Sequence, residues 1–368
     1  MIYFDHNATT PVDKRVVEAM LPYITSFYGN PSSLYKMGRL VRSAIDTARE
    51  QVAALVDVPP SQLIFTSGGT EANNLVIKSI SDHSVIATSV IEHPSISELA
   101  RQWGDLHIPI PVNRQGVVTI AAIEQLTQRL AKPKLASVMM ANNETGGVQN
   151  IAEIALLLKS AKILLHTDAV QALGKIPVSF AQLAVDFMSL SSHKIYGPKG
   201  CGALVFAKNL NLTPQLIGGG QEGGWRAGTE NVAAIVGFGK AAELAKLELD
   251  SRAEHCFLLR QQLEEGLKSI PHVTIFSEQA VRLPNTLQFS VEGIDGEMLL
   301  MQLDQKNIAV SSGSACASGG GKASAVLTSM GVEQQLAKGA IRVSLGKDND
   351  AAEIKQFITV LKSFVMKG

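Results

Sequence analysis

The sequence predicts an α/β protein with a large domain built on a mostly parallel sheet and a smaller α+β domain. Short apolar runs alternate with helical patterns over the first two thirds of the chain, which is typical of parallel strands covered by helices on both faces. After Pro284 the elements follow in a mixed order. The length of 368 residues suits about two domains. We therefore expect a large domain at 12–250 and a small domain made of 1–11 and 251–368.

Each element is predicted from the spacing of apolar residues. Between Leu34 and Leu55 they recur at every third or fourth position, which predicts a helix over about 33–56. Short apolar runs predict buried strands at 63–66, 85–88, 107–110, 136–141, 162–167, 186–191 and 202–207. Helical patterns lie at 70–80, 119–130 and 150–160, and one or two long helices are expected over 232–268. The small domain is expected to have strands at 286–290, 308–311 and 341–345 and helices at 296–305 and 351–366.

Composition limits the class of function. Charged residues make up 18% of the chain and hydrophobic residues 46%, which excludes a disordered or coiled-coil protein. Lysine plus arginine and aspartate plus glutamate each number 33, so the chain lacks the net positive charge of a protein that binds nucleic acid or anionic membranes. The expected partner is a small molecule or another protein.

The cysteines and the first residues predict a cytoplasmic protein. Cys201, Cys256 and Cys316 are odd in number, widely spaced and without a CxxC pair, so neither a disulfide framework nor a bound metal is expected. The first residues lack the basic region of a signal peptide, and no stretch reaches the ~20 apolar residues that span a bilayer. We expect a soluble protein in a reducing compartment.

Polar and ionisable residues follow five consecutive predicted strands. Ligands of open parallel α/β sheets bind outside the carboxyl ends of the strands, so we expect these residues to line one cleft. Taken singly, several have ordinary explanations, since a glycine turn is common, an aspartate can cap a helix and a lysine can lie on the surface. The set as a whole is harder to explain in that way. Its members are Ser67-Gly68-Gly69-Thr70-Glu71, Glu92-His93-Pro94, Asn142-Asn143-Glu144-Thr145-Gly146, Asp168 with Gln171, and Ser191-Ser192-His193-Lys194.

This set matches what pyridoxal phosphate (PLP) requires. The PLP aldehyde forms a Schiff base with a lysine, its ring nitrogen needs an anionic partner, and its phosphate needs backbone N–H donors. Lys194 would supply the first group and Asp168 the second. The other candidates are Gly69, Thr70, Ser191 and His193 for the phosphate, His93 for stacking on the ring, and Asn143 and Gln171 for the ring hydroxyl oxygen.

Motifs spread over nearly the whole chain carry a resemblance to one known family. They are, in order, YFDHNATTPVD, YGNPSSL, FTSGGTEANN, EHP, ANNETG, HTDAVQ, SSHKIYGPKG, GGGQEGGWRAGTEN, SSGSAC and IRVSLG. With these motifs the sequence resembles the NifS/IscS-type cysteine desulfurases of the class V aminotransferase group. The resemblance implies the type I fold of PLP-dependent transferases, a homodimer, and conversion of L-cysteine to L-alanine with the sulfur held as a persulfide on an enzyme cysteine. That sulfur would supply iron-sulfur cluster or thio-cofactor synthesis through a protein acceptor such as an iron-sulfur scaffold.

The same resemblance implies roles for individual residues. Lys194 would bind the PLP aldehyde, Asp168 would pair with the ring nitrogen, and Cys316 would be the nucleophile that takes the sulfur. His93 would also carry a proton. Arg342, with Asn143, would bind the substrate carboxylate, because the planar guanidinium suits a carboxylate. The phosphate would be held by Gly69, Thr70, Ser191, Ser192 and His193, together with Thr229 from the other subunit of the homodimer.

The surroundings of the cysteines support this division of roles. Cys316 lies among serine, glycine and alanine, and not among the large apolar residues of a core, whereas Cys201 and Cys256 fit core positions. The chain departs from the family at Gly223, where arginine is usual, and at 321–323, where Gly-Lys-Ala replaces the usual Leu-Glu-Pro. These departures leave the identity of the sulfur acceptor open.

Other functions also remain open from the sequence. A selenocysteine lyase would use the same residues, while another class V aminotransferase-type enzyme would not need Cys316. A non-catalytic sulfur carrier or regulatory protein would not need Lys194, Asp168, His93 and Arg342 together. A nucleotide-binding Rossmann protein is the least supported, because the sequence contains neither GxGxxG nor GxxxxGK at the predicted turns.

Overall fold

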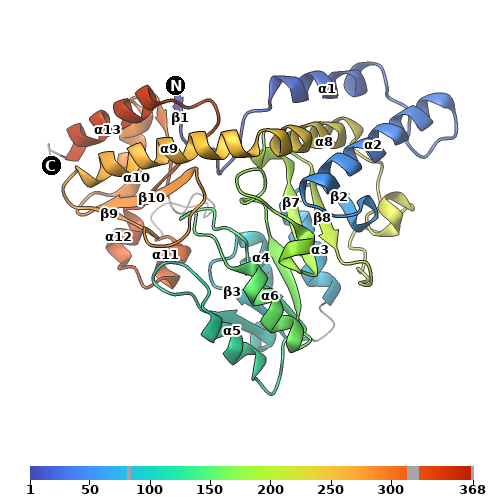
Figure 1. The fold of residues 1–368 in the computed structure, drawn as a ribbon, viewed down its shortest axis with the longest axis horizontal. Helices are drawn as coiled ribbons and strands as arrows, with labels where there is room; N and C mark the ends of the chain where they lie inside the picture. Colours follow the sequence, from blue (N-terminus) through green and yellow to red (C-terminus); the bar gives the residue numbers. More distant parts are fainter. Residues whose placement is uncertain (81–83, 313–322, 366–368) are drawn as a thin grey trace.

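A computed structural model describes residues 1–80, 84–312 and 323–365 and contains the predicted α/β architecture (Figure 1). Its largest sheet has seven strands, and all of them except β8 run in the same direction. The strands are, in spatial order, β2 (Leu63–Thr66), β8 (Gly202–Phe206), β7 (Phe187–Ser191), β6 (Leu164–Asp168), β5 (Leu135–Ser137), β3 (Ile86–Ser89) and β4 (His107–Ile110). The mostly parallel sheet is therefore confirmed.

Helices cover both faces of this sheet, and the strands alternate accordingly. In β2, Leu63 and Phe65 belong to the core on one face, whereas Ile64 belongs to the core on the other. In β8, Val205 and Leu204 divide in the same way, as expected where successive side chains point to opposite faces. The helices of this part are α1 (Lys14–Thr25), α2 (Lys36–Leu55), α3 (Gly69–Ile80), α4 (Pro94–Arg101), α5 (Ile120–Thr127), α6 (Ile151–Ser160), α7 (Phe180–Leu183) and α8 (Val232–Leu247).

The C-terminal part is built on a four-stranded antiparallel sheet in the order β12-β13-β10-β9, and β1 pairs in parallel with β11. Phe4, Phe289 and Phe357 are fully buried and stack edge to face in its core. Its elements are β1 (Ile2–Tyr3), α9 (Leu249–Lys268), β9 (Val273–Ile275), β10 (Thr286–Val291), α10 (Gly296–Asp304), β11 (Ile308–Ala309), β12 (Ser311–Ser312), α11 (Ala325–Ser329), α12 (Gln334–Lys338), β13 (Ile341–Ser344) and α13 (Ala351–Val365).

Some predicted elements differ from the observed ones. The single strand expected at 308–311 is two, because β11 pairs with β1 whereas β12 pairs with β13. The strand expected at 136–141 ends at Ser137. The sequence pattern did not predict α1, α4, α7, α11, α12 or β9, most of which are short. The domain boundary near residue 250 stays a prediction; α8 and α9 meet there at Glu248 and run across both parts of the molecule (Figure 1).

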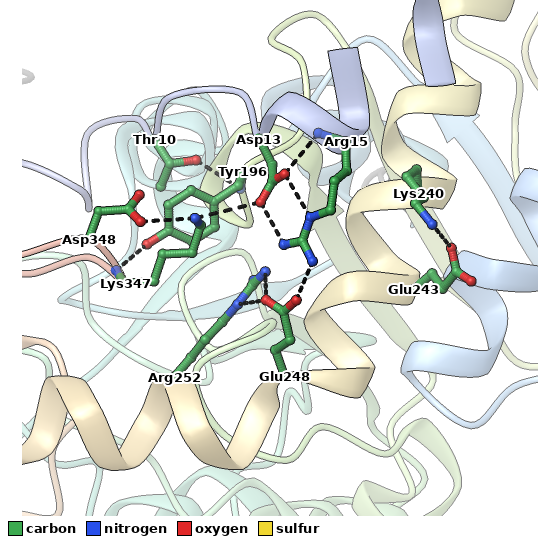
Figure 2. Close-up of polar contacts among 10 residues, drawn as sticks. All are labelled: Thr10, Asp13, Arg15, Tyr196, Lys240, Glu243, Glu248, Arg252, Lys347 and Asp348. Carbon is green, nitrogen blue, oxygen red and sulfur yellow. Dashed lines mark hydrogen bonds and ion pairs between the residues drawn. The ribbon is translucent and has the colours of Figure 1, made fainter. Parts of the chain in front are cut away.

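An ion-pair cluster fixes this helix junction to the N-terminal segment, as Figure 2 shows. Glu248 accepts hydrogen bonds of 2.6 Å from both Arg15 and Arg252. Asp13 caps α1 and accepts from the side chain of Arg15 at 2.9 and 3.0 Å. These arginines hold the pKa of Asp13 and Glu248 below their usual values. Residues 13–15 are therefore tied to the start of α9.

The same cluster reaches Tyr196, two residues after Lys194 (Figure 2). The Tyr196 N–H donates to Oγ1 of Thr10 at 2.8 Å, and its hydroxyl accepts from the backbone N–H of Lys347 at 2.8 Å. The ring lies 5.1 Å from the guanidinium carbon of Arg252 and 5.3 Å from Nζ of Lys347, within the range of cation–π contacts. Tyr196 thus fixes the backbone that carries Lys194. In the described part of the chain, no helix is both long and apolar enough to cross a membrane.

Candidate active site

A cavity of about 330 Å³ lies at the carboxyl ends of the central parallel strands. It brings together side chains from β6, from the turns after β2, β3, β5 and β7, from the N-terminal segment and from β13. This is the edge of the sheet at which the sequence predicted a cleft. The predicted residues that line the cavity are Gly69, Thr70, His93, Asn143, Asp168, Gln171, Ser191, His193, Lys194 and Arg342.

Lys194 is held by the backbone of the N-terminal segment. It ends the short 3-10 helix Ser192–Lys194 that follows β7. Its Nζ donates to the carbonyl oxygens of Asn7 at 2.6 Å and Ala8 at 2.7 Å. The next turn is closed by Ser192, whose carbonyl accepts from the N–H of Ile195 at 3.1 Å. The carbonyls of Asn7 and Ala8 therefore fix the position of the Lys194 amine at the wall of the cavity.

Asp168 is a buried carboxylate at the end of β6. Its Oδ2 accepts from Nδ2 of Asn73 at 2.7 Å, and its Oδ1 accepts from the N–H of Val170 at 2.9 Å. A carboxylate has about four lone-pair positions, so two of them are left for a donor in the cavity. Asp168 is 5% exposed, which gives any ion pair it makes there a low effective dielectric.

His93 lies beside Asp168 and caps α4. Its Nδ1 accepts from the N–H of Ser95 at 3.1 Å, so the neutral ring carries its proton on Nε2. The Ser95 hydroxyl is 2.8 Å from the same nitrogen and accepts from Asn73 at 2.9 Å, which links the histidine to the partner of Asp168. Burial lowers the pKa of His93; Asp168 raises it and Lys194 lowers it further. The ring is accordingly neutral at neutral pH.

The start of α3 forms a cradle suited to a phosphate. A Cβ at Gly69 would lie 2.9 Å from Cγ2 of Val170, so glycine allows this backbone to approach the turn that follows β6. The first N–H groups of a helix have no acceptor within the helix and point outward. Glu71 in this first turn is neutralised by Arg226, 3.0 Å away. The cradle therefore presents backbone donors without an unpaired carboxylate.

Arg342, on β13, forms the far wall of the cavity. Its NH1 donates to the carbonyl of Asn143 at 3.0 Å, and its NH2 donates to Oδ1 of Asp5 at 2.6 Å. Its side chain is 5% exposed, and its Nε has no hydrogen-bond partner among the described residues. The pairing with Asp5 was not predicted. The guanidinium is thus held in place from two sides with donor capacity left over.

Two acids near the cavity, Glu92, which is buried, and Glu144, which is half-buried, also differ from ordinary carboxylates. Burial raises the pKa of Glu92 to about 8, although it accepts from the Ser89 hydroxyl and from the N–H of Met139. Burial also raises the pKa of Glu144 to about 7, with Ser324 and Arg342 opposing the shift. At neutral pH Glu92 is largely protonated and Glu144 lies near its midpoint.

Two of the predicted residues that the structure describes, Ser192 and Thr229, do not line this cavity. Ser192 is fully buried, and its Oγ, which has no partner among the described residues, faces Gly197 because the 3-10 helix turns it away from the cavity. Thr229 is exposed and lines a different cavity. Its predicted contact across a homodimer stays a prediction. Cys316 lies outside the described residues. Cys201 and Cys256 are buried, and burial raises the pKa of both thiols, as expected of core cysteines.

The structure adds residues that sequence reasoning missed. Asn73 lies one turn into α3 and orients Asp168; a buried asparagine on an otherwise apolar helix face was the available signal. Lys175 lies four residues after Gln171 and bonds its side chain, a spacing that could have indicated a contact. Asp5, Asn7 and Ala8 carried no signal, because their contacts to Arg342 and Lys194 span more than 180 positions.

The residues gathered in this cavity agree with the family of proteins to which the chain is similar. The model of the family described as aminotransferase class-V matches residues 2–357. The chain is 41% identical to a cysteine desulfurase IscS of Methanosarcina thermophila over all of this chain and 92% of that protein. A NifS-like protein from Rickettsia africae has a solved structure with a TM-score of 0.93 and 39% identity, covering all of both chains. A structure of SspA in complex with cysteine has a TM-score of 0.82 and 31% identity over 94% of this chain and 99% of that one.

Proposed function

From the premise that this chain belongs to the class-V aminotransferase family, we propose that it is a PLP-dependent cysteine desulfurase. The observation that carries the proposal is the convergence of Lys194, Asp168, His93 and Arg342 on one cavity, in a chain 41% identical to a cysteine desulfurase over its full length. L-cysteine is the proposed substrate; SspA, a structural neighbour, was solved with cysteine bound. The products are L-alanine and an enzyme persulfide.

The residues of the cavity fit PLP. The backbone donors at Gly69 and Thr70, with Ser191 and His193, would hold the phosphate, and Asp168 would accept from the ring nitrogen. His93 would stack on the ring, and Asn143 and Gln171 would contact its hydroxyl oxygen. When bound, PLP supplies an acceptor for the electron pair that remains on the substrate Cα when its proton leaves. The family is PLP-dependent, which agrees with this donor set.

Lys194 is the proposed base at the substrate Cα. Its Nζ is directed by two carbonyl oxygens and lies at the wall of the cavity, within the same site as Asp168. His93 is neutral and carries its proton on Nε2, so this nitrogen would act as a hydrogen-bond donor to the substrate sulfur, the position at which the histidine would serve as proton carrier. Both groups are half-buried at the wall of the same cavity.

Arg342 is the proposed anchor of the substrate carboxylate. Its guanidinium is held by Asn143 and Asp5, and its spare donor capacity lies at the cavity. The carboxylate and the amino group of L-cysteine would then be fixed at opposite walls. This leaves the substrate side chain as the part free to meet the sulfur acceptor.

Cys316 is the proposed sulfur acceptor on the enzyme. Its thiolate forms a bond to the substrate sulfur while the Cβ–S bond of the substrate breaks, and protons complete L-alanine, so that L-cysteine and a thiol become L-alanine and a persulfide. Thiolate chemistry of this kind needs a reducing compartment, and we propose the cytoplasm. The onward acceptor would be a protein, such as an iron-sulfur scaffold.

A homodimer would complete the site through Thr229. Support comes from a set of exposed apolar side chains on α1 and the segment that follows it, which is unusual for a monomer surface. Ile24 is 61% exposed and Leu34 is 87% exposed. An interface formed there would cover these side chains.

The proposal is tested with purified protein, PLP and L-cysteine. We expect a visible absorbance on PLP addition, one alanine per sulfur released, and a mass increase of one sulfur on Cys316. Cys316→Ala should keep the absorbance and lose the persulfide, whereas the control Cys201→Ala should keep both. A protein that takes up no PLP would contradict the cofactor, and sulfur release by Cys316→Ala at the wild-type rate would contradict the role of Cys316. Alanine formed from selenocysteine but not from cysteine would favour a selenocysteine lyase.

A further inference from the structure

We propose that Lys175 is a positioning residue: it turns the side-chain amide of Gln171 so that an N–H group faces the cofactor cavity, and it fixes the Asn7 segment that directs Lys194. The inference rests on the proposed function, because it concerns how this chain would receive PLP. Lys175 does not line the cavity that contains Lys194, Asp168 and Arg342. It acts from outside the cavity, through Gln171 and Asn7, which line the cavity.

The contacts of Lys175 leave Gln171 one orientation. Nζ of Lys175 donates to Oε1 of Gln171 at 2.7 Å, and Nε2 of Gln171 donates to the carbonyl of Asn7 at 2.9 Å. The Asn7 carbonyl can only accept, so the amide nitrogen of Gln171 must point to it and the amide oxygen must point to the N–H donor of Lys175. Gln171 is 5% exposed and lines the cavity, and its second N–H is the group left to face it. That N–H is the donor that a ring oxygen requires.

Lys175 fixes Asn7 in the same way. Its Nζ donates to Oδ1 of Asn7 at 2.9 Å, and Asn285 donates to the same oxygen at 3.1 Å. Nδ2 of Asn7 is then directed to Oγ1 of Thr286 at 2.9 Å. The backbone carbonyl of Asn7 accepts from Lys194 at 2.6 Å. The Lys175 amine therefore positions two groups. One is the Gln171 N–H that would donate to the cofactor, and the other is the Asn7 carbonyl that accepts from Lys194.

The local fold brings Lys175 to this place. Residues 169–176 form hydrogen-bonded turns after β6, in which the N–H of Lys175 donates to the carbonyl of Ala172 at 3.1 Å. Gly174 has φ +67°, and a Cβ there would lie 2.8 Å from Cγ2 of Ile195. Glycine at this position lets the turn pack against the residue that follows Lys194.

The electrostatic surroundings of Lys175 do not favour a charged amine. Burial lowers its pKa most, Lys194 and Arg342 lower it further, and Cys256 alone opposes them. A second cavity, of about 30 Å³, lies beside it and is lined by His6, Tyr196, Cys256 and Lys347 among others. Burying an amine here costs free energy, which its hydrogen bonds to Gln171 and Asn7 offset.

The experiment compares Lys175→Met with Lys175→Gln in the full-length protein. The two replacement side chains have the same length, one bond shorter than lysine, and glutamine alone has an N–H donor. The readouts are the Kd for PLP, the absorption maximum of bound PLP and Tm. Lys240→Met is the control, since Lys240 on α8 pairs with Glu243 and contacts neither Gln171 nor Asn7.

We expect Lys175→Met to weaken PLP binding about ten-fold, the equivalent of one hydrogen bond to a charged group, and to shift the absorption maximum, with effects on PLP that do not follow the change in Tm. Lys175→Gln should lie closer to wild type. Gln171→Leu should reproduce part of the change, and Lys175→Met should have a smaller effect in that background than in the wild type, because only its contact with Asn7 remains to be lost.

Full additivity with Gln171→Leu would overturn the inference. The inference would also be overturned if Lys175→Met kept the wild-type Kd for PLP and the wild-type absorption maximum. It would be overturned as well if Lys175→Met and Lys175→Gln lost PLP affinity equally and in proportion to their loss of Tm. If Lys175→Met does not fold, the same additivity is measured with Lys175→Gln. A wild-type protein that does not bind PLP would instead contradict the proposed function.

Discussion

Ionisation of Glu144 is expected to lower the stability of the protein above neutral pH. Glu144 follows β5, and its Oε2 accepts from the Ser324 hydroxyl at 2.5 Å and from Nε2 of Gln288 at 3.3 Å. Burial raises its pKa from 4.5 to about 7 despite the favourable charge of Arg342. The side chain therefore binds its proton more tightly in the folded protein than in the unfolded chain.

The sign and the size of the effect follow from this difference. Because the folded-state pKa is the higher one, the stabilising contribution is complete below pH 4.5, decreases between 4.5 and about 7, and is lost above that. A pKa difference of about 2.5 corresponds to about 3 kcal/mol of unfolding free energy. With an unfolding entropy of about 2.1 cal/mol/K per residue, 368 residues convert this into roughly 4 °C of Tm.

Glu144→Gln removes the ionisation and keeps an oxygen that accepts from Ser324. We expect the variant to melt at the wild-type temperature at pH 5 and about 4 °C higher at pH 8.5. Thermal unfolding followed by circular dichroism over this pH range measures the difference, with Glu98→Gln on the exposed face of α4 as the control. A difference in Tm that is the same at both pH values would refute the reasoning, because it would show that Glu144 does not change its protonation in this range.

Two further predictions concern arginines, of which Arg342 is buried and Arg49 is half-buried. Arg342→Lys should raise KM for L-cysteine about ten-fold while the absorbance of bound PLP stays unchanged, because an ammonium cannot replace a planar forked donor; an unchanged KM would exclude Arg342 as the carboxylate anchor. Arg49→Met should destabilise the protein by about 3–5 kcal/mol, because it removes the 2.7 Å bidentate partner of Glu222, whose side chain is 2% exposed. The control is Arg101→Met, which breaks the exposed pair with Glu98 and should lower the free energy of unfolding, measured with urea, by less than about 1 kcal/mol. Equal losses of unfolding free energy in Arg49→Met and Arg101→Met would contradict this difference.

The fold and one wall of the site could be predicted because their signals are local. The strand at 63–66 is an apolar run between turn residues, and the helix over 36–55 follows a three-and-four spacing, so both were predicted within a few residues. Asp168 and His93 follow strands directly. In a parallel sheet, position after a strand is enough to predict that such residues meet.

The wall formed by the N-terminal segment and β13 could not be predicted from local sequence patterns. β11 and β12 read as one strand because a single apolar residue, Val310, separates them, and their partners lie in different parts of the chain. Ser192 was included with its neighbours in the sequence, yet the turn of a 3-10 helix directs its side chain away from the cavity. Asn73 contacts Asp168, and Lys175 contacts Gln171 and Asn7, but neither directly follows a strand, so composition at the strand ends gave no indication of them.

Residues 5–8 connect the two walls and set their separation. Asp5 pairs with Arg342 on β13, while the carbonyls of Asn7 and Ala8 accept from Lys194 after β7. The bridge between Asp5 and Ser344 fixes this segment to the sheet that carries Arg342. The distance between the proposed carboxylate anchor and the proposed base is thus determined by a few residues of extended backbone. A change in this segment should therefore alter KM and cofactor binding together, whereas a change at Arg342 alters KM alone, and this difference separates the positioning of the site from its chemistry.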